Sequence, residues 1–126
     1  MKKLSIKMRS VITMVNSRRK GADGERELRD KLIELGFHEC RRGQQFCGAN
    51  GDADVVGVPG LHIECKRVQA LNLPSAMAQS IRDARDSEIP VVMHRKDRDY
   101  WKVTMRLEDF AKLWKKANEV KSDEMS

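Results

Sequence analysis

Two short apolar runs separated by Pro59-Gly60 constrain the fold of this chain more than any other feature. The first run is Asp54 to Val58 and the second is Leu61 to Lys66, so each has the length of an ordinary strand. A Pro-Gly pair between two such runs favours a tight turn. The segment is therefore predicted to form a β-hairpin.

The segments around this hairpin predict helices and further strands. Helices are predicted at Asp23 to Leu35, Pro74 to about Asp86, and Leu107 to about Val120. Gly36 is expected to end the first of them. Strands are predicted at Phe37 to Arg42, Ile89 to His94 and Tyr100 to Arg106, with a loop at Gly43 to Gly51. This order of elements predicts an α/β fold, a β-sheet with helices packed on it.

Length and composition narrow the class of protein. The 126 residues are enough for one compact domain and too few for two. The longest uncharged stretch near the start, Ser10 to Ser17, is far shorter than the roughly 20 residues of a membrane span. Lys7 and Arg9 interrupt the apolar run that a signal peptide requires. We therefore expect a soluble, cytoplasmic protein of a bacterium, archaeon or phage-infected cell, without a membrane partner.

The positive charge is concentrated at the N-terminus. The net charge is +6, and residues 1–20 hold seven Lys or Arg and no acid. The other 106 residues therefore carry 18 basic and 19 acidic groups. We divide the chain into a basic arm (1–20), a folded domain (21–120) and a short tail (121–126). Such an arm favours binding to a polyanion such as DNA, because each neutralised phosphate releases counterions. The alternative is a tail that only increases solubility.

The three cysteines favour a reducing compartment. Cys40, Cys47 and Cys65 cannot all pair within one chain, and no C-x-x-C motif indicates a zinc site. We expect reduced, partly buried thiols.

The second run of the hairpin contains the candidate catalytic residues. Glu64 and Lys66 point to one face of a strand, with Cα atoms roughly 7 Å apart. Asp54, at the start of the partner strand, can add a second carboxylate. Two carboxylates, a main-chain carbonyl and waters are the oxygen ligands that Mg²⁺ prefers. A neighbouring lysine can stabilise charge on a phosphate or orient an attacking water.

This interpretation depends on the register of the hairpin. A strict two-residue loop at Pro59-Gly60 would place Asp54 opposite Cys65 and on the wrong face. An odd-length loop or a β-bulge places Asp54 opposite Glu64 instead. Gly57 or Gly60 can supply that irregularity.

Glu25 is a further candidate. On the predicted helix it shares the stripe of Leu28, Leu32 and Leu35, whereas Glu27 points to solvent. An inward carboxylate is costly unless something satisfies it. A metal site would do so, and a capping role in the first turn is the alternative.

These motifs together resemble the PD-(D/E)xK nuclease superfamily, and most closely its archaeal and phage Holliday junction resolvases. The resemblance rests on Gly21-x-x-Gly24-Glu25-Arg26-Glu27-Leu28, Asp54-Val55-Val56-Gly57 and Ile63-Glu64-Cys65-Lys66. It implies a restriction-endonuclease-like mixed β-sheet flanked by helices. It also implies a homodimer that nicks branched or duplex DNA.

The resemblance assigns roles to individual residues. Asp54 and Glu64 become metal ligands, joined by the main-chain carbonyl of Cys65, with Lys66 as the catalytic lysine and Glu25 completing the acidic site. Mg²⁺ is the implied cofactor, and Mn²⁺ is expected to substitute. Ala53 replaces the usual proline, which leaves Asp52 open as the ligand, although the Val-Val run favours Asp54.

Other polar residues are candidates for DNA contact or support. The candidates for DNA contact are Arg18, Arg19, Lys20, Arg41, Arg42, Arg67 and Gln79. Each arginine or lysine can equally be a solvated surface charge. His62 shares the face of Glu64 and can support it. Rival functions are a repair or restriction-type endonuclease of the same fold and a non-catalytic DNA-binding module.

Overall fold

The computed structural model describes residues 5–44 and 53–125, with the backbone alone described for 6–18 and 120–125. Cys47, Asp52 and most of the predicted loop at Gly43 to Gly51 therefore lie outside the described residues. The side chain of Arg18 also lies outside them.

A five-stranded mixed sheet forms the centre of the fold. Its strands, in spatial as well as chain order, are β1 (Arg41–Arg42), β2 (Val55–Val56), β3 (Leu61–Arg67), β4 (Ile89–Arg95) and β5 (Lys102–Thr104). All neighbouring pairs are antiparallel except β3 and β4, which are parallel. Parallel neighbours need a crossover connection, and a helix supplies it here.

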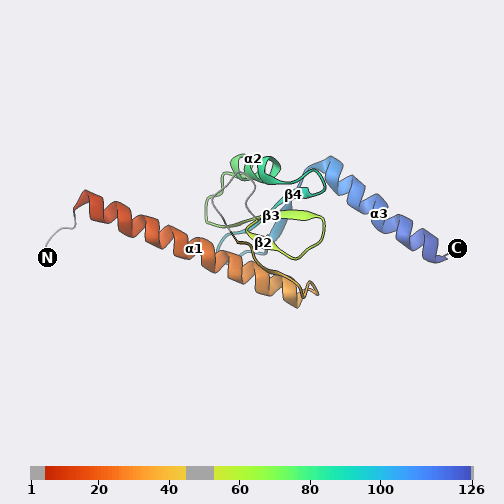
Figure 1. Cartoon of the computed structure of the whole chain (residues 1–126), viewed down its shortest axis with the longest axis horizontal. Helices are drawn as coiled ribbons and strands as arrows, with labels where there is room; N and C mark the ends of the chain where they lie inside the picture. The colour runs from red at the N-terminus through yellow and green to blue at the C-terminus, as the bar shows by residue number, and fades with distance from the viewer. Residues whose placement is uncertain (1–4, 45–52, 126) are drawn as a thin grey trace.

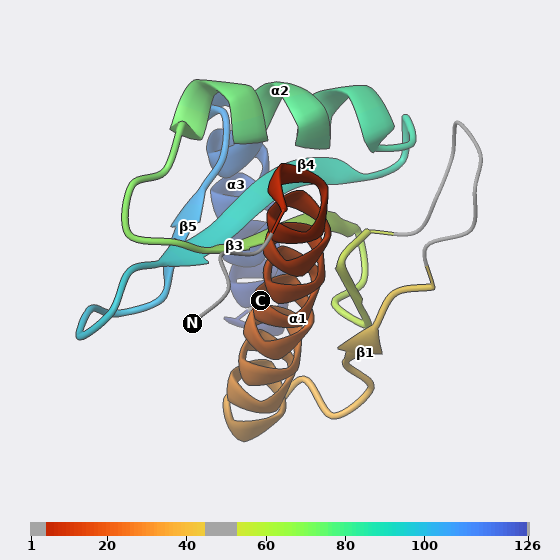
Figure 2. The ribbon, with the colours of Figure 1, turned by 90° about the vertical axis from the view of Figure 1, so that its left-hand side faces the viewer.

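Two of the three helices cover the two sides of the central strands. The helices are α1 (Ile6–Glu34), α2 (Leu73–Asp83) and α3 (Leu107–Met125). Figures 1 and 2 show α2 on one side of β3 and β4 and α1 crossing the other, while α3 extends away from the sheet. The predicted α/β, restriction-endonuclease-like fold is confirmed. In the described part of the chain, no helix is long and apolar enough to cross a membrane.

The main core lies between α1 and the sheet. Leu28 and Leu32 of α1 pack in one cluster with Ile63 of β3 and Val91 of β4, and Ile63 and Val91 are fully buried. Ile63 and Cys65 face this cluster, so the alternation of a strand turns His62 and Glu64 toward α2. Each large apolar side chain buried in this way contributes roughly 1.5–3 kcal/mol.

The first helix begins far earlier than predicted. It starts at Ile6 rather than near Asp23, so residues 6–20, which we expected to be an extended or partly helical arm, are continuous with the helix. Apolar periodicity reports which residues are buried, and a helix can continue without it where no proline intervenes. Gly21 and Gly24 therefore lie inside the helix. Gly24 allows α1 to approach β3 closely, because a Cβ there would lie 3.0 Å from Cβ of Arg67.

Several boundaries and burial predictions also need correction. The predicted strands Phe37 to Arg42 and Tyr100 to Arg106 are reduced to β1 and β5, and α3 continues beyond Val120. Leu35 is 63% exposed, because the helix ends there and turns at Gly36. Gly36 has a φ of 108°, so its predicted role in ending the helix is confirmed. The buried free thiols of Cys40 and Cys65 agree with the prediction for those two residues.

The hairpin has the register that the sequence argument required. Val55 pairs with Ile63, which places Asp54 level with Glu64. Extending this register pairs Gly57 with Leu61 and leaves a loop of odd length between them. Gly57 and Gly60 both have positive φ, 111° and 84°. The predicted irregularity is therefore located at these two glycines.

Replacing Gly57 by alanine should destabilise the protein strongly. A Cβ at this position would lie 2.4 Å from the main-chain oxygen of Glu39 and would require a left-handed backbone. We expect Gly57→Ala to lower the free energy of unfolding by at least about 2 kcal/mol in urea titrations. Gly60→Ala is the matched control, because its φ is also positive but no atom lies within 4 Å. It should cost about 1 kcal/mol; equal losses would contradict this account of Gly57.

Candidate active site

The hairpin brings two carboxylates together. Asp54 sits just before β2, and its main-chain N–H donates to the carbonyl of Ile63 at 3.0 Å. Its Oδ2 accepts a 2.9 Å hydrogen bond from the main-chain N–H of Cys65. These two bonds clamp Asp54 against the strand on either side of Glu64. Glu64 is only 4% exposed, so the two acids meet with little access to water.

The proximity of these acids changes the chemistry of Asp54. Burial and the adjacent Glu64 raise the pKa of Asp54 to about 7, and Glu25 adds to the effect. The main-chain N–H of Cys65 opposes this rise. A buried and a partly buried carboxylate that cannot both ionise easily need either a shared proton or a cation between them. The donor set therefore fits a divalent cation with oxygen ligands.

Lys66 and Gln79 complete a hollow around the acids. Lys66 follows on the same face of β3, and Gln79 approaches from α2. The hollow has a volume of about 400 Å³. Its lining consists of Lys20, Gly21, Glu25, Asp54, Glu64, Cys65, Lys66, Arg67, Val68 and Gln79. The four residues predicted to be catalytic thus share one hollow with three of the predicted DNA contacts, which are Lys20, Arg67 and Gln79.

Glu25 on α1 is paired with a basic residue of β1. Its Oε2 accepts a 2.9 Å hydrogen bond from Nε of Arg42 on β1. The side chain of Glu25 is 14% exposed, and it faces the hollow as predicted. The capping alternative is excluded, because α1 begins at Ile6 and Glu25 lies many turns inside it. Arg42 thus fixes Glu25 at the rim of the acidic site.

The thiol of Cys65 does not contribute to this site as a ligand. Burial and the neighbouring acids raise the pKa of the Cys65 thiol, so it stays protonated. Its side chain faces the core cluster, whereas its main chain borders Asp54. Any contribution of Cys65 to a cation must therefore come from its carbonyl, as the resemblance implied.

Glu27 does not point freely to solvent as predicted. Its Oε2 lies 2.8 Å from Nε of Arg67 in an ion pair, and it also pairs with Arg95. Arg67 in turn pairs with Asp97 at 3.1 Å. The guanidinium of Arg67 is therefore held between two acids at the edge of the hollow. Sequence spacing does not reveal this network, because its members come from α1, β3, β4 and the turn that follows β4.

The remaining predicted DNA contacts differ in their relation to the hollow. Lys20 lies on its rim, and Arg19 beside it on α1 is exposed. Arg41 is exposed on β1, next to Arg42. Lys20 from α1 and Gln79 from α2 line the hollow itself, Arg42 reaches its rim through Glu25, and Arg19 and Arg41 lie exposed beside them in the chain.

The acidic pair is incomplete as a side-chain metal cage. Among the residues that the structure describes, no three His, Cys, Asp or Glu side chains are placed to hold a metal together. Asp54 and Glu64 are in contact, whereas Glu25 is turned to Arg42. Mg²⁺ keeps much of its hydration in proteins and is commonly bound by one or two carboxylates, so the two acids are enough protein side chains for it.

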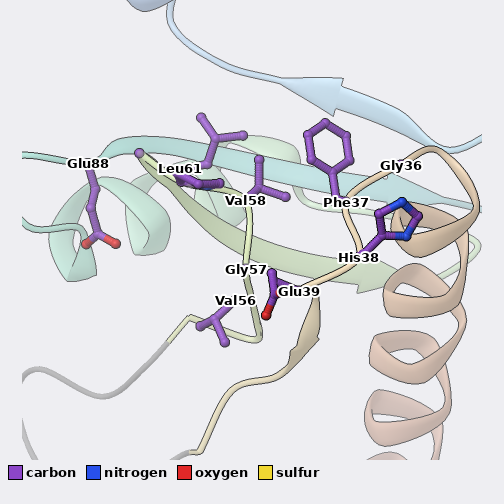
Figure 3. Close-up of a pocket in the computed structure, with 11 residues that line it drawn as sticks. Gly36, Phe37, His38, Glu39, Val56, Gly57, Val58, Leu61 and Glu88 are labelled. Atoms are coloured by element: carbon purple, nitrogen blue, oxygen red, sulfur yellow. The ribbon is translucent and has the colours of Figure 1, made fainter.

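A larger hollow of about 540 Å³ lies at the other end of β3. Its walls are mostly apolar, with Phe37, Val58 and Leu61 among them. Figure 3 shows its two acids, Glu39 and Glu88, set well apart. An active site needs polar groups that converge on one point, so the smaller acidic hollow is the better candidate.

Comparison with known protein families agrees with this geometry. A family profile described as "Phage putative PDDEXK endonuclease" matches residues 16–126. The chain belongs to this family. The match spans the hairpin with Asp54, Glu64 and Lys66, and the superfamily predicted from these motifs is confirmed. No curated protein and no solved structure matches the chain.

Membership of the phage PDDEXK endonuclease family makes the protein a nuclease. The acidic hollow is then its candidate active site, because it holds the aspartate, the Glu-x-Lys pair and the helical glutamate in one place.

The paired acids predict a specific dependence of stability on pH without metal. The pKa of Asp54 is raised to about 7 in the folded protein. The contribution of Asp54 to the free energy of unfolding is therefore full below about pH 4 and is lost as the pH rises to 7. Asp54→Asn removes this loss and keeps an oxygen for the Cys65 N–H. The stability gain of this variant, measured by thermal melts in EDTA, should grow between pH 5 and pH 8 by at least about 1 kcal/mol, or roughly 4 °C.

Asp30→Asn is the control, because Asp30 is exposed and its charge is screened by solvent. Its effect on the melting temperature should be the same at both pH values. If the stability gain of Asp54→Asn were the same at pH 5 and pH 8, the proposed contact between the two acids would be contradicted.

Proposed function

We propose that this protein is a metal-dependent, structure-selective DNA endonuclease that nicks four-way junctions symmetrically, as a Holliday junction resolvase. The register of the hairpin is the observation that carries the proposal. It sets Asp54 beside Glu64, with Lys66 on the same face of β3. This trio is the minimum that phosphodiester hydrolysis needs: oxygen ligands for a cation and a nearby amine.

Each residue of the hollow has a distinct role in this proposal. Asp54 and Glu64 hold Mg²⁺ together with the carbonyl of Cys65, and Mn²⁺ is accepted by the same oxygens. When bound, the cation supplies charge stabilisation at the phosphate and a stronger nucleophile from water. Lys66 donates to the phosphate oxygens or to the attacking water. Asp54 must release its proton before it can bind a cation, so affinity should increase with pH.

Glu25 and Arg42 form the boundary of the site toward β1. Their 2.9 Å ion pair keeps a third carboxylate within the field of Asp54 without placing it against the other two. We propose that Glu25 supports the cation through water or as a further ligand. In that role Arg42 positions Glu25 and also presents a guanidinium to DNA.

The basic side chains around the hollow support DNA as the substrate. Arg19 and Lys20 lie on α1, and Arg41 lies on β1, so phosphates on that side meet positive charge. The sequence places Lys7, Arg9 and Arg18 farther along the same helix. We propose that α1 follows the DNA backbone away from the cleavage site. Such contacts set orientation and do not read base sequence.

We further propose that the protein acts as a homodimer through α3. At 100° per residue, its large apolar residues fall in a sector about 120° wide. These are Leu107, Phe110, Leu113 and Trp114, which are 37–75% exposed. The rings of Phe110 and Trp114 stack at 6.3 Å on this face. In a two-fold pair of antiparallel helices, the same stripe meets itself, so no second surface is needed.

A second copy is the occupant that fits the proposed reaction. Symmetric nicking of two strands requires two equivalent active sites, and two-fold symmetry supplies them. The charged residues Lys112, Lys115 and Glu119 lie on the opposite side of α3, so they would remain in water.

Cleavage of labelled four-way junction and linear duplex, with Mg²⁺ or with EDTA, tests the activity. The wild-type protein should nick the junction at symmetric positions in Mg²⁺ and cut nothing in EDTA. Glu64→Ala should lower the rate at least about 1000-fold while junction binding is kept. Glu34→Ala is the control, because Glu34 is exposed at the far end of α1.

The other outcomes decide between the rival functions. Equal cutting of duplex and junction would replace the resolvase with a general nuclease of the same fold. Binding without cutting under all metal conditions would replace it with a non-catalytic DNA-binding module. Substantial residual cleavage by Glu64→Ala would remove Glu64 from the proposed site.

The mass of the protein in solution tests the proposed dimer. Light scattering after gel filtration should give twice the chain mass for the wild type. Trp114→Glu places a charge in the apolar stripe and should give a monomer. Lys112→Glu introduces the same side chain on the opposite side of α3 and should leave the dimer intact. A wild-type monomer at tens of micromolar, or a Trp114→Glu dimer, would exclude this interface.

A further inference from the structure

His62 is a buried polar residue that the proposed chemistry does not use. It lies on β3 two residues before Glu64, with 3% of its surface exposed. Both side chains point toward α2, because residues two apart on a strand share a face. Ser80 on α2 donates its hydroxyl to the main-chain carbonyls of His62 at 3.3 Å and Val91 at 3.0 Å. The helix therefore fixes the backbone that carries the imidazole.

Acids lie near both nitrogens of the imidazole. Nε2 is 3.4 Å from Oε1 of Glu64, and Nδ1 is 3.9 Å from Oε1 of Glu88. Glu88 is itself held, because its Oε1 accepts a 2.9 Å bond from the main-chain N–H of Arg85. Nε2 is fully buried and has no hydrogen-bond partner in the part of the chain described here. Oε1 of Glu64, at 3.4 Å, is an acceptor within reach of this nitrogen.

We propose that His62 is a positioning residue whose Nε2–H donates to Glu64 and holds that carboxylate facing Asp54. The inference rests on the proposed metal site. A glutamate has three rotatable bonds, so a ligand of this type loses affinity when its orientation is not fixed. Glu64 is 4% exposed, and solvent cannot take over the role of the imidazole there. Glu88, anchored at the α2–β4 turn, keeps the ring in the orientation that presents Nε2.

A matched pair of substitutions separates the hydrogen bond from packing. Gln and Met have similar lengths and volumes, but only Gln retains a donor near the position of Nε2. Binding of Mn²⁺ to the full chain, without DNA, is measured by isothermal titration calorimetry. We expect His62→Gln to bind within about threefold of the wild type. His62→Met should bind at least about tenfold more weakly, as for other residues that orient metal ligands.

Melting temperatures of the two variants in EDTA provide the readout for a structural role alone. Similar melting temperatures with different Mn²⁺ affinities support positioning. Equal Mn²⁺ affinities for His62→Met and the wild type would overturn it, whatever the melting temperatures. A wild type that binds no Mn²⁺, like a Glu64→Gln control, would instead remove the metal site itself. The two failures are therefore distinguishable.

A measurement on the wild-type protein covers the case in which neither variant folds. Long-range ¹H–¹⁵N NMR spectra distinguish protonated from unprotonated imidazole nitrogens. A proton on Nε2 of His62 in the metal-free protein supports the donor role. A bare Nε2 with the proton on Nδ1 alone would overturn it, because Glu64 would then face a lone pair.

Discussion

The repulsion between the carboxylates of Asp54 and Glu64 is the interaction around which the site is built. Burial removes the water that would screen them, and the pKa of Asp54 rises to about 7 as a result. The fold tolerates this cost because the N–H of Cys65 donates to Asp54 at 2.9 Å. A structure that keeps two acids in contact at its centre is incomplete without a proton or a cation there. The chain belongs to a nuclease family, and a pair of acids that needs a cation agrees with that membership.

The backbone of the hairpin is what imposes this contact. Gly57 adopts a φ of 111° directly against the main chain of Glu39, where no side chain fits. Together with Gly60 it gives the loop an odd length, which turns Asp54 to the face of Glu64. A shift of one residue would turn it to the opposite face, where the apolar core lies. The position of Asp54 therefore depends on two glycines that have no functional side chain.

Ion pairs between distant segments attach α1 to the sheet. Arg42 on β1 holds Glu25, while Glu27 receives Arg67 from β3 and Arg95 from β4. Single ion pairs at a surface contribute little, but partly buried networks fix geometry. On the other side of the sheet, α2 anchors the backbone at His62. The acidic pair is thus held from both faces, while α3 makes little use of its apolar stripe within the chain.

The sequence by itself determined the elements around the site and the residue types within it. Alternation along 61–66 placed Glu64 and Lys66 on one face, and Pro59-Gly60 marked the turn, because these depend on local backbone geometry. The pattern did not show that α1 begins at Ile6 or that Leu35 is exposed, because apolar periodicity indicates a buried face and not where a helix begins or ends. Tertiary structure alone decided the register and the partners of Glu25 and Glu27. These depend on contacts between segments distant along the chain, and local propensity carries no information about such contacts.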